Sequence, residues 1–511
     1  MIQNKRIFLY DLKLETFYDS NDSGYGDFNG LKQKIDYLTF LDVNCVVIED
    51  ILKHYENKFE LEKVNFNYGS IEDFKELKKA LDLKNIDLAI TLNLTKIKQS
   101  ATNLNNYENL YRKANLEKTQ ELTILDTYIK NENKYLNLNT IASFVEEFKK
   151  VINFYNNLNI QTLILEDFDF LIEDKKLNKQ NRFQFLVDIF KIVKKINVNI
   201  KVILKSHKFK KEAYLSLIKF NEKFNCFDYL YLTHLSLNNL NTHLKWAQKM
   251  PLNYQELFNQ FKLFINQSNV ILALGSDQVG RITSRWGSEN SYLFETIKTF
   301  NLFLMSSKNS IAIYYGDEFG ILRAKIPINY QFNNPDFNEE KRFIQTKNIS
   351  KETYYLAQSY QNKWTSHTWM AWNNSYCSGA SNRGNGNIFN SIDFQNNNVE
   401  NQLNNKYSAL NFFKKSIRFI FYKYKDFFLD QNTKIEYDFS KEGYIKIFHK
   451  NLIQDKSIIF IINLSKNSLR SNHYDNNYKI LLTTYANKFY ASIPEFLMPY
   501  ESLVLISERK Q

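Results

Sequence analysis

Side chains that carry oxygen recur at alternate positions in the segment FYDSNDSGYGDF, residues 17–28. Such spacing lets a loop surround a hard cation such as Ca²⁺ or Mg²⁺, although Gly30 stands where an EF-hand has its bidentate glutamate. A polar turn rich in Asp, Asn, Ser and Gly explains the same residues without a metal. In the metal interpretation the one cofactor is a structural Ca²⁺ or Mg²⁺, and its ligands are Asp19, Asn21, Ser23, the Tyr25 carbonyl and Asp27.

Basic residues cluster in the segment KSHKFKK, residues 205–211. Together with Lys96, Arg281 and Arg285, these lysines would form a basic rim able to attract phosphate or an acidic protein surface. In a chain this rich in lysine, a solvated charged rim is the simpler interpretation.

Cysteine and histidine residues indicate neither a disulfide framework nor a zinc site. Cys45, Cys226 and Cys377 are odd in number, far apart and without CxxC spacing, which fits a reducing cytoplasm. His207 and His234 have no second ligand at a metal-binding spacing. We therefore interpret both histidines as packed or exposed residues.

Composition indicates a folded chain of two or three domains. The 511 residues are 44% hydrophobic, with only 5 prolines and 13 glycines. The N-terminus lacks an apolar signal core, and the longest clearly apolar run, residues 458–464, is too short to span a bilayer. Lysine and asparagine are abundant along the whole chain. We therefore attribute the net charge of +12 to this composition rather than to a nucleic-acid groove. We expect a cytoplasmic protein with no membrane span and no nucleic-acid partner.

Short apolar runs alternate with helical patterns through most of the chain. This alternation predicts a parallel sheet, and eight repeats favour a closed (β/α)₈ barrel over an open doubly wound sheet. Ser70 and Asp73 form a capping box that predicts a helix over residues 71–82. The eight predicted strands lie at residues 7–12, 45–50, 88–94, 163–167, 201–206, 229–232, 270–274 and 311–315.

Two departures from this alternation define the domains. Residues 96–135 are an insertion after the third strand, and a helix over 408–424 is followed by alternating runs typical of an antiparallel β-domain. We predict a barrel of residues 1–95 and 136–425, a shortened inserted domain of residues 96–135, and a C-terminal β-sandwich of residues 426–511.

Several motifs resemble those of glycoside hydrolase family 13, the α-amylase superfamily, and in particular its oligo-1,6-glucosidase, α-glucosidase and trehalose-6-phosphate hydrolase branch. They include the segment at 16–38 with its metal loop, NYGSIEDFKELKKAL at 67–81, GSDQVGRITSRWG at 275–287, IYYGDEFGI at 313–321 and MPYESLVLI at 498–506. Their order matches as well, and they span nearly the whole chain. The resemblance implies the barrel and a metal ligated by the 19–27 loop, where Ser23 replaces an aspartate and weakens binding.

The resemblance also implies positions for retaining glycoside hydrolysis, which needs a carboxylate nucleophile and a protonated carboxylic acid about 5 Å apart. Glu166 stands at the nucleophile, Lys205 at the acid and Asp277 at the third carboxylate. Only Asp277 keeps the family residue. A shift by one residue would make Asp167 the nucleophile, but the neighbouring apolar pattern would then no longer match.

The supporting positions have changed as well: Thr91 stands for an aspartate, Lys96 and Ser276 for histidines, and Ile164 for the arginine that orients the nucleophile. No catalytic set is therefore intact, and we predict an ion pair between Lys205 and Glu166 within about 4 Å.

Three functions fit these residues. The first is a catalytically inactive family member, a pseudoenzyme, that serves as an interaction or scaffold module with an unidentified protein partner, or within a larger assembly. The second is an α-glucosidase in carbohydrate metabolism with residual or altered activity. The third is a non-hydrolytic binder of a sugar or sugar phosphate. For the first function we expect docking through residues 321–402, which hold Tyr354, Tyr355, Tyr360, Trp364, Trp369, Trp372 and Tyr376. For the tryptophans, packing against the barrel is the competing explanation.

Overall fold

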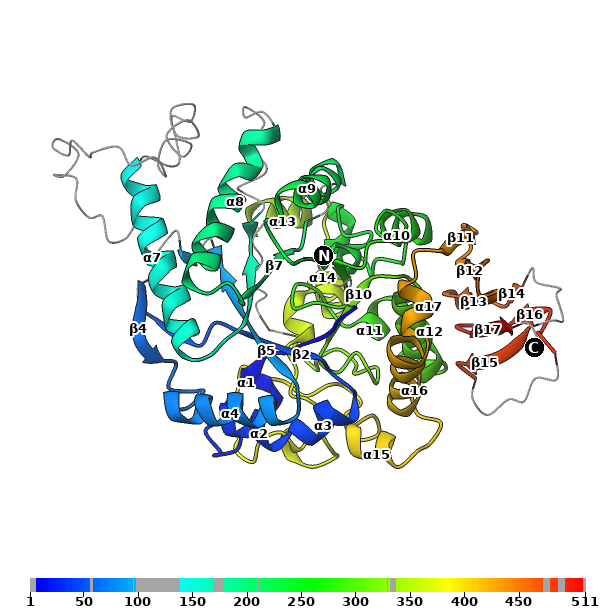
Figure 1. Ribbon diagram of the computed structural model, residues 1–511. Helices are drawn as coiled ribbons and strands as arrows, with labels where there is room; N and C mark the ends of the chain where they lie inside the picture. The colour runs from blue at the N-terminus through cyan, green and yellow to red at the C-terminus, as the bar shows by residue number, and fades with distance from the viewer. Residues whose placement is uncertain are drawn as a thin grey trace. The chain divides into compact units, whose positions relative to one another are not determined.

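The computed structural model describes residues 6–55, 58–94, 96–97, 138–168, 179–208, 211–328, 330, 337–471, 478–485 and 492–508. Most of the predicted insertion, like Lys210, lies outside these residues. The chain divides into two compact units, Met1–Asn44 with Thr233–Gln511 and Cys45–Leu232. Figure 1 colours the chain by residue number, from blue at the N-terminus to red at the C-terminus. The predicted domain boundaries at residues 95, 135 and 425 stay predictions.

A closed parallel barrel is the central feature, in the order β1-β10-β9-β8-β7-β6-β5-β2. The predicted (β/α)₈ fold is therefore confirmed. Each strand overlaps one of the runs predicted from the sequence. The strands are β1 (Phe8–Asp11), β2 (Cys45–Glu49), β5 (Asp87–Asn93), β6 (Thr162–Glu166), β7 (Lys201–Ser206), β8 (Tyr229–Leu232), β9 (Val270–Leu272) and β10 (Ser310–Tyr314).

The unit Cys45–Leu232 contains β2, β5, β6, β7 and β8, paired in parallel in that order. Their apolar residues are buried, as expected for parallel strands that are covered on both faces. The predicted capping box is present, since the Ser70 hydroxyl accepts from the Asp73 amide and the Asp73 carboxylate accepts from Ser70. The helices are α4 (Ile71–Leu83), α7 (Leu138–Asn157), α8 (Lys179–Ile196) and α9 (Lys211–Phe224), and the hairpin β3 (Leu52–Tyr55) and β4 (Lys58–Val64) was not predicted.

The other unit contains β9, β10 and β1, again in parallel. Residues 28–40 form two helices, because the backbone leaves the helical region at Lys34. The predicted helix 408–424 is also divided, into an α-helix and a π-helical segment, Arg418–Lys423. The helices are α1 (Leu14–Phe17), α2 (Phe28–Gln33), α3 (Ile35–Phe40), α10 (Tyr254–Phe261), α11 (Ile282–Trp286), α12 (Leu293–Met305), α13 (Phe337–Thr346), α14 (Lys351–Gln361), α15 (Val399–Leu403), α16 (Ala409–Ile417) and α17 (Lys425–Leu429).

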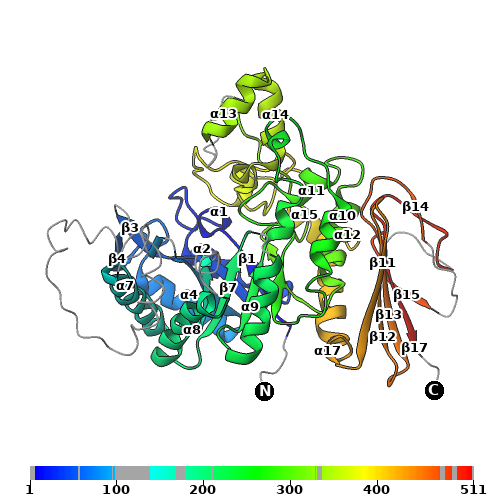
Figure 2. The same cartoon turned by 90° about the horizontal axis from the view of Figure 1, so that it is seen from above.

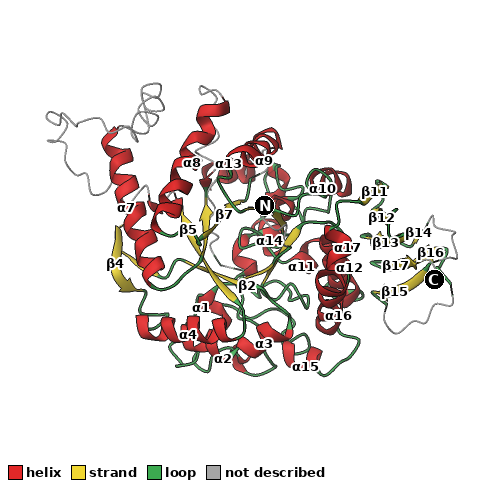
Figure 3. Ribbon diagram, in the orientation of Figure 1, coloured by secondary structure: helices red, strands yellow, loops and turns green. Residues whose placement is uncertain are grey.

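Two antiparallel sheets end this unit, as predicted. Five strands pair in the order β11-β12-β13-β17-β15, and β14 pairs with β16. Figure 3 shows these strands without helices among them, while Figure 2 shows α13 and α14 projecting from the same unit. The bounds are β11 (Thr433–Phe439), β12 (Tyr444–Asn451), β13 (Lys456–Asn463), β14 (Leu469–Arg470), β15 (Lys479–Thr483), β16 (Phe496–Leu497) and β17 (Ser502–Glu508).

Among the helices that the structure describes, none has both the length and the apolar character needed to cross a bilayer.

Candidate active site

Glu166 and Lys205 meet at the carboxyl ends of two neighbouring strands. Parallel pairing of β6 with β7 sets the two residues opposite one another. The Lys205 Nζ lies 3.2 Å from the Glu166 Oε1, with 5% of the lysine side chain and 16% of the glutamate side chain exposed. The predicted ion pair is confirmed.

Three further side chains complete this cluster. The Nε2 atom of His207 lies 2.9 Å from the same Glu166 Oε1. Asn93, at the end of β5, donates from Nδ2 to Asp167 Oδ2 at 2.7 Å, and its contact with Glu166 Oε2 is 3.5 Å. Two cationic or polar donors therefore converge on one carboxylate oxygen.

The electrostatics of the cluster keep Glu166 ionised. Burial by itself would raise the pKa of this carboxyl, but attraction to Lys205 and the hydrogen bond from His207 outweigh it, so the pKa lies well below its usual range. An ionised carboxylate cannot donate a proton, and its negative charge is already balanced by an ammonium group. Glu166 consequently cannot serve as the carboxylic acid that protonates a leaving oxygen.

The supporting positions in the same unit do not assemble a catalytic set. Thr91 lies opposite Ile164 in the β5–β6 ladder, and Ile164 is fully buried. An apolar side chain therefore fills the position where the resemblance placed an arginine. Lys96 is exposed, and its backbone amide donates to the Asn93 side chain.

Asp277 and Ser276 follow β9 in the other unit. The Asp277 Oδ2 accepts from Gln278 Nε2 at 3.0 Å, and the Asp277 carbonyl accepts from His367 Nε2 at 3.3 Å. Burial, with repulsion from Lys13, lowers the pKa of His367 to about 3. Ser276 is buried and shares a 2.9 Å hydrogen bond with Ser236.

The family model for the α-amylase catalytic domain matches residues 14–137 and 173–420. The chain belongs to the α-amylase family. Among curated relatives, the oligo-1,6-glucosidase of Heyndrickxia coagulans is 24% identical over 282 residues, which cover 52% of this chain and 47% of the relative. The chain thus matches about half the length of that enzyme. A human amino acid transporter heavy chain is 32% identical over 87 residues, 16% of this chain and 13% of the heavy chain.

Solved structures of the α-amylase family share the whole fold. The trehalose-6-phosphate hydrolase of Bacillus licheniformis superimposes with a TM-score of 0.78 at 15% identity, covering 99% of this chain and all of that one. The trehalulose synthase of Pseudomonas mesoacidophila MX-45 gives a TM-score of 0.78 at 13% identity, covering 98% and 99%. At such identities the likeness concerns the fold alone.

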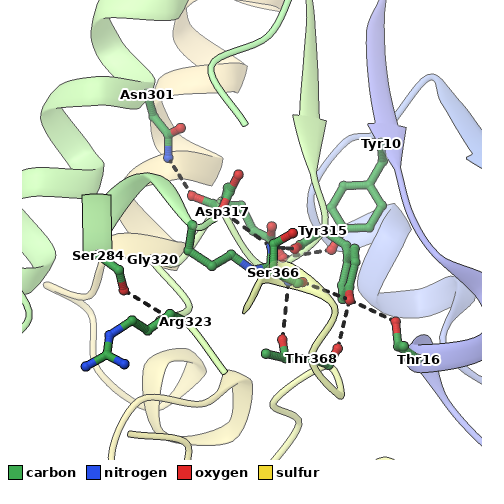
Figure 4. Close-up of polar contacts among 12 residues, drawn as sticks. Tyr10, Thr16, Ser284, Asn301, Tyr315, Asp317, Gly320, Arg323, Ser366 and Thr368 are labelled. Atoms are coloured by element: carbon green, nitrogen blue, oxygen red, sulfur yellow. Dashed lines mark hydrogen bonds and ion pairs between the residues drawn. The ribbon is translucent and has the colours of Figure 1, made fainter. Parts of the chain in front are cut away.

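A buried polar network occupies the end of β10, where the IYYGDEFGI motif lies (Figure 4). Arg281 donates to the Tyr315 carbonyl at 2.5 Å and lies 3.5 Å from the Asp317 carboxylate. The Tyr315 hydroxyl donates to the Thr368 carbonyl at 2.7 Å. Gly275 approaches this network so closely that a Cβ there would come within 1.9 Å of Asp317. These family motifs therefore serve packing.

The same network corrects the predicted basic rim. Arg281 and Arg285 have 1% and 3% exposure, and Arg285 donates to the Ser236 carbonyl at 2.6 Å. Neither guanidinium is available to a solvated rim, because each is used inside the fold. Burial raises the pKa of Asp317 to about 7, against the opposing charge of Arg281.

The 19–27 loop closes through its own hydrogen bonds. Asp19 accepts from the amides of Ser23 and Gly24 at 3.1 and 2.8 Å, and Asp27 accepts from the Gly30 amide at 2.6 Å. The Ser23 hydroxyl donates to the Tyr25 carbonyl at 3.2 Å, so two predicted ligands bond to each other.

With serine in place of an aspartate, the alternating positions of this loop offer two carboxylates, Asp19 and Asp27, and the amide oxygen of Asn21, which also accepts from the Ser23 amide. Within the described residues, no cluster of three or more His, Cys, Asp or Glu side chains could hold a metal. The donors fit a hard cation weakly, and the metal stays a proposal.

Sequence reasoning missed His207 and Asn93 as members of the ionic cluster. His207 lies two residues after Lys205, and side chains two apart in a strand share a face, which was the available signal. Asn93 could be found only from the register between β5 and β6. His234 is packed as predicted: its ring lies edge-on to Phe264, and burial lowers its pKa to about 3.

Proposed function

We propose that this chain is a non-hydrolysing member of the α-amylase family that acts as a protein-interaction or scaffold module. The ion pair between Lys205 and Glu166 carries the proposal. It joins the positions that the resemblance assigned to acid and nucleophile, and it leaves neither group free for its role. A lysine ammonium, with an ordinary pKa of about 10.4, donates protons poorly at neutral pH.

The magnitude of the loss supports inactivity. Removing a general acid slows such reactions by about 10²–10⁴-fold. The nucleophile is also longer by one methylene than the family's aspartate, and a displacement of about 1 Å costs a further 10²-fold or so. The oxygens of Glu166 are in addition engaged by Lys205 and His207, which weakens attack on a sugar carbon.

The exposed fractions of the aromatic side chains indicate which of them a partner could contact. Trp369 is fully buried and Trp372 is 7% exposed, which favours the competing explanation that these two tryptophans pack against the barrel. Tyr376 is 66% exposed and Leu356, on α14, 57% exposed. We place the docking surface at Tyr376 and the exposed side of α14. The partial match to a transporter heavy chain, whose name describes a chain of a transporter, supports a non-enzymatic role.

Hydrolysis assays test inactivity directly. We expect no release of glucose above background from α-1,4-glucosides, α-1,6-glucosides, sucrose or trehalose 6-phosphate, with the Heyndrickxia oligo-1,6-glucosidase as the positive control. The variant Asp277→Ala separates the chain's own activity from a contaminant. Turnover that this variant abolishes would overturn the proposal.

Photocrosslinking tests the docking surface. A photoreactive residue at position 376 is expected to crosslink one defined protein in native cells, and the same residue at position 437, exposed in β11, is the matched control. Equal labelling from both positions, or recovery of the chain only as a free monomer, would count against an interaction role.

Residual glucosidase activity is the second candidate, and His207 is the observation that favours it. Its Nε2 lies 2.9 Å from Glu166, so a protonated imidazole is the one remaining side chain of the cluster suited to donate a proton near neutral pH. Activity from this source would vanish in His207→Asn while surviving in Lys205→Met. Unchanged rates in His207→Asn would remove this candidate.

A further inference from the structure

A pocket lies in the unit Met1–Asn44 with Thr233–Gln511. It shares no lining residue with the ionic cluster. Its volume is about 680 Å³, within the range of about 300–1,000 Å³ typical of small-molecule sites. Lys325, Tyr376, Cys377 and two short segments, residues 383–386 and 388–396, line it, and neither Glu166 nor Asp277 does. The lining includes two cations, three aromatic rings and several side-chain amides.

A left-handed turn at the edge of this pocket includes the lining residue Cys377. Cys377, Ser378 and Gly379 have φ angles of 46°, 60° and 70°, and two of these residues are not glycine. Backbone of this kind is unfavourable for residues other than glycine and persists only where its surroundings hold it, often at ligand sites. The Ser378 hydroxyl donates to Asn390 Oδ1 at 2.8 Å and so ties the turn to another lining residue. The pocket is therefore preformed.

The 19–27 loop supports the adjoining wall. The Ser381 hydroxyl donates to Asp19 Oδ2 at 2.6 Å, and Asn382 Nδ2 donates to Asp22 Oδ1 at 3.0 Å. At Gly24 an added Cβ would come within 2.7 Å of the Gly384 carbonyl, so the two segments touch through backbone. These contacts fix the backbone on both sides of Arg383.

Charge in the pocket favours an anion. Neither Lys325 nor Arg383 has an ion-pair partner within the described part of the chain, and both are exposed. Asp393 is the acidic residue of the lining, and its carboxylate accepts from Asn396 Nδ2 at 2.8 Å. An arginine fork together with a lysine suits a phosphate group.

The other lining residues suit the hydroxyl groups and the ring of a sugar phosphate. Asn385, Gln395 and Asn390 bring amides, which both donate to and accept from hydroxyl groups. Tyr376 and Phe389 bring flat apolar faces against which the carbon side of a sugar ring can lie.

We propose that this pocket binds a phosphorylated sugar, with Arg383 and Lys325 on the phosphate and the amides on the hydroxyls. The site is separate from the ionic cluster and involves no bond cleavage. It does not depend on whether the chain hydrolyses glycosides, but Tyr376 also belongs to the proposed docking surface, so a partner bound there would compete with the sugar phosphate.

Titration calorimetry of the full chain tests this, with glucose 6-phosphate, glucose and inorganic phosphate as the three probes. We expect glucose 6-phosphate to bind about tenfold or more tightly than either glucose or phosphate alone, because only it engages both halves of the pocket. Arg383→Gln and Lys325→Gln should each weaken it about tenfold. Lys347→Gln, an exposed lysine outside the lining, is the matched control.

Each other outcome overturns the proposal in a distinct way. Equal affinity for glucose and glucose 6-phosphate would remove the role of the cations. If inorganic phosphate bound as tightly as glucose 6-phosphate, the pocket would be an anion site that does not recognise a sugar. No detectable binding of glucose 6-phosphate, or binding unchanged in Arg383→Gln with an unaltered melting temperature, would exclude the pocket.

Discussion

The ionic cluster at β6 and β7 and the polar network at β10 differ in how closely their residues resemble the family's motifs. At β10 the motif residues resemble the family's, and Arg281, Tyr315 and Asp317 are locked into a buried network. At β6 and β7 the acid and nucleophile positions carry Lys205 and Glu166 instead. The difference teaches that residues which hold the barrel together and residues which react within it are retained for separate reasons.

The largest expected effect lies in the β10 network. Arg281→Leu leaves Asp317 without its opposing charge in a buried site, and we expect the free energy of unfolding to fall by about 3–5 kcal/mol. Urea denaturation measures it. The exposed Arg383→Gln serves as control and should change stability by less than about 0.5 kcal/mol. A loss in Arg281→Leu as small as the control's would remove the packing role of the motif.

Breaking the ionic cluster should cost less, because Glu166 retains His207. Lys205→Met is expected to lower the free energy of unfolding by about 1.5–3 kcal/mol. In the double variant with Glu166→Gln, much of this loss should return, since no charge is left unpaired. Strictly additive single and double variants would show that the pair is not coupled.

The same carboxyl sets a pH dependence with a defined sign. The folded-state pKa of Glu166 lies below its unfolded value, so its stabilisation is present above about pH 4.5 and is lost as pH falls further. The stability difference between the native chain and Glu166→Gln should shrink as pH falls below about 4.5. A difference that grows in acid would reverse the assignment.

Asp317 should show the opposite sign in the other region. Its folded-state pKa of about 7 lies above the value of an unfolded aspartate, so ionising it disfavours the fold as pH rises. Relative to Asp317→Asn, the native chain should lose stability between about pH 5 and 7.5. Thermal melts at half-unit intervals measure this, and a flat difference would contradict the raised pKa.

The smallest effect concerns the 19–27 loop. With two carboxylates, the native loop should gain thermal stability from Ca²⁺ only at millimolar concentrations, whereas Ser23→Asp supplies a third carboxylate and should respond at lower concentrations. Ser20→Asp, in the same loop but outside the alternating set, is the control. Identical calcium responses in all three chains would discard the metal interpretation.

Sequence alone predicted the barrel because each of its strands is a short apolar run and the helices between them follow their own period. It also predicted the Lys205–Glu166 pair, since parallel neighbours end at the same edge of a sheet. The prediction that Arg281 and Arg285 are exposed was wrong. Both bond to backbone carbonyls inside the fold, and the sequence does not reveal such buried acceptors. The sequence did not predict the pocket near residues 376–396 for a similar reason. Left-handed backbone at Cys377 and Ser378 cannot be recognised from these residue types.

The Lys205–Glu166 pair links two positions of the sequence. Lys205→Glu alone would set two carboxylates side by side in a mostly buried site. Changing Glu166 alone would remove the acceptor that now balances the charge of the lysine. Either single change destabilises the fold, so we expect substitutions at positions 166 and 205 to occur together.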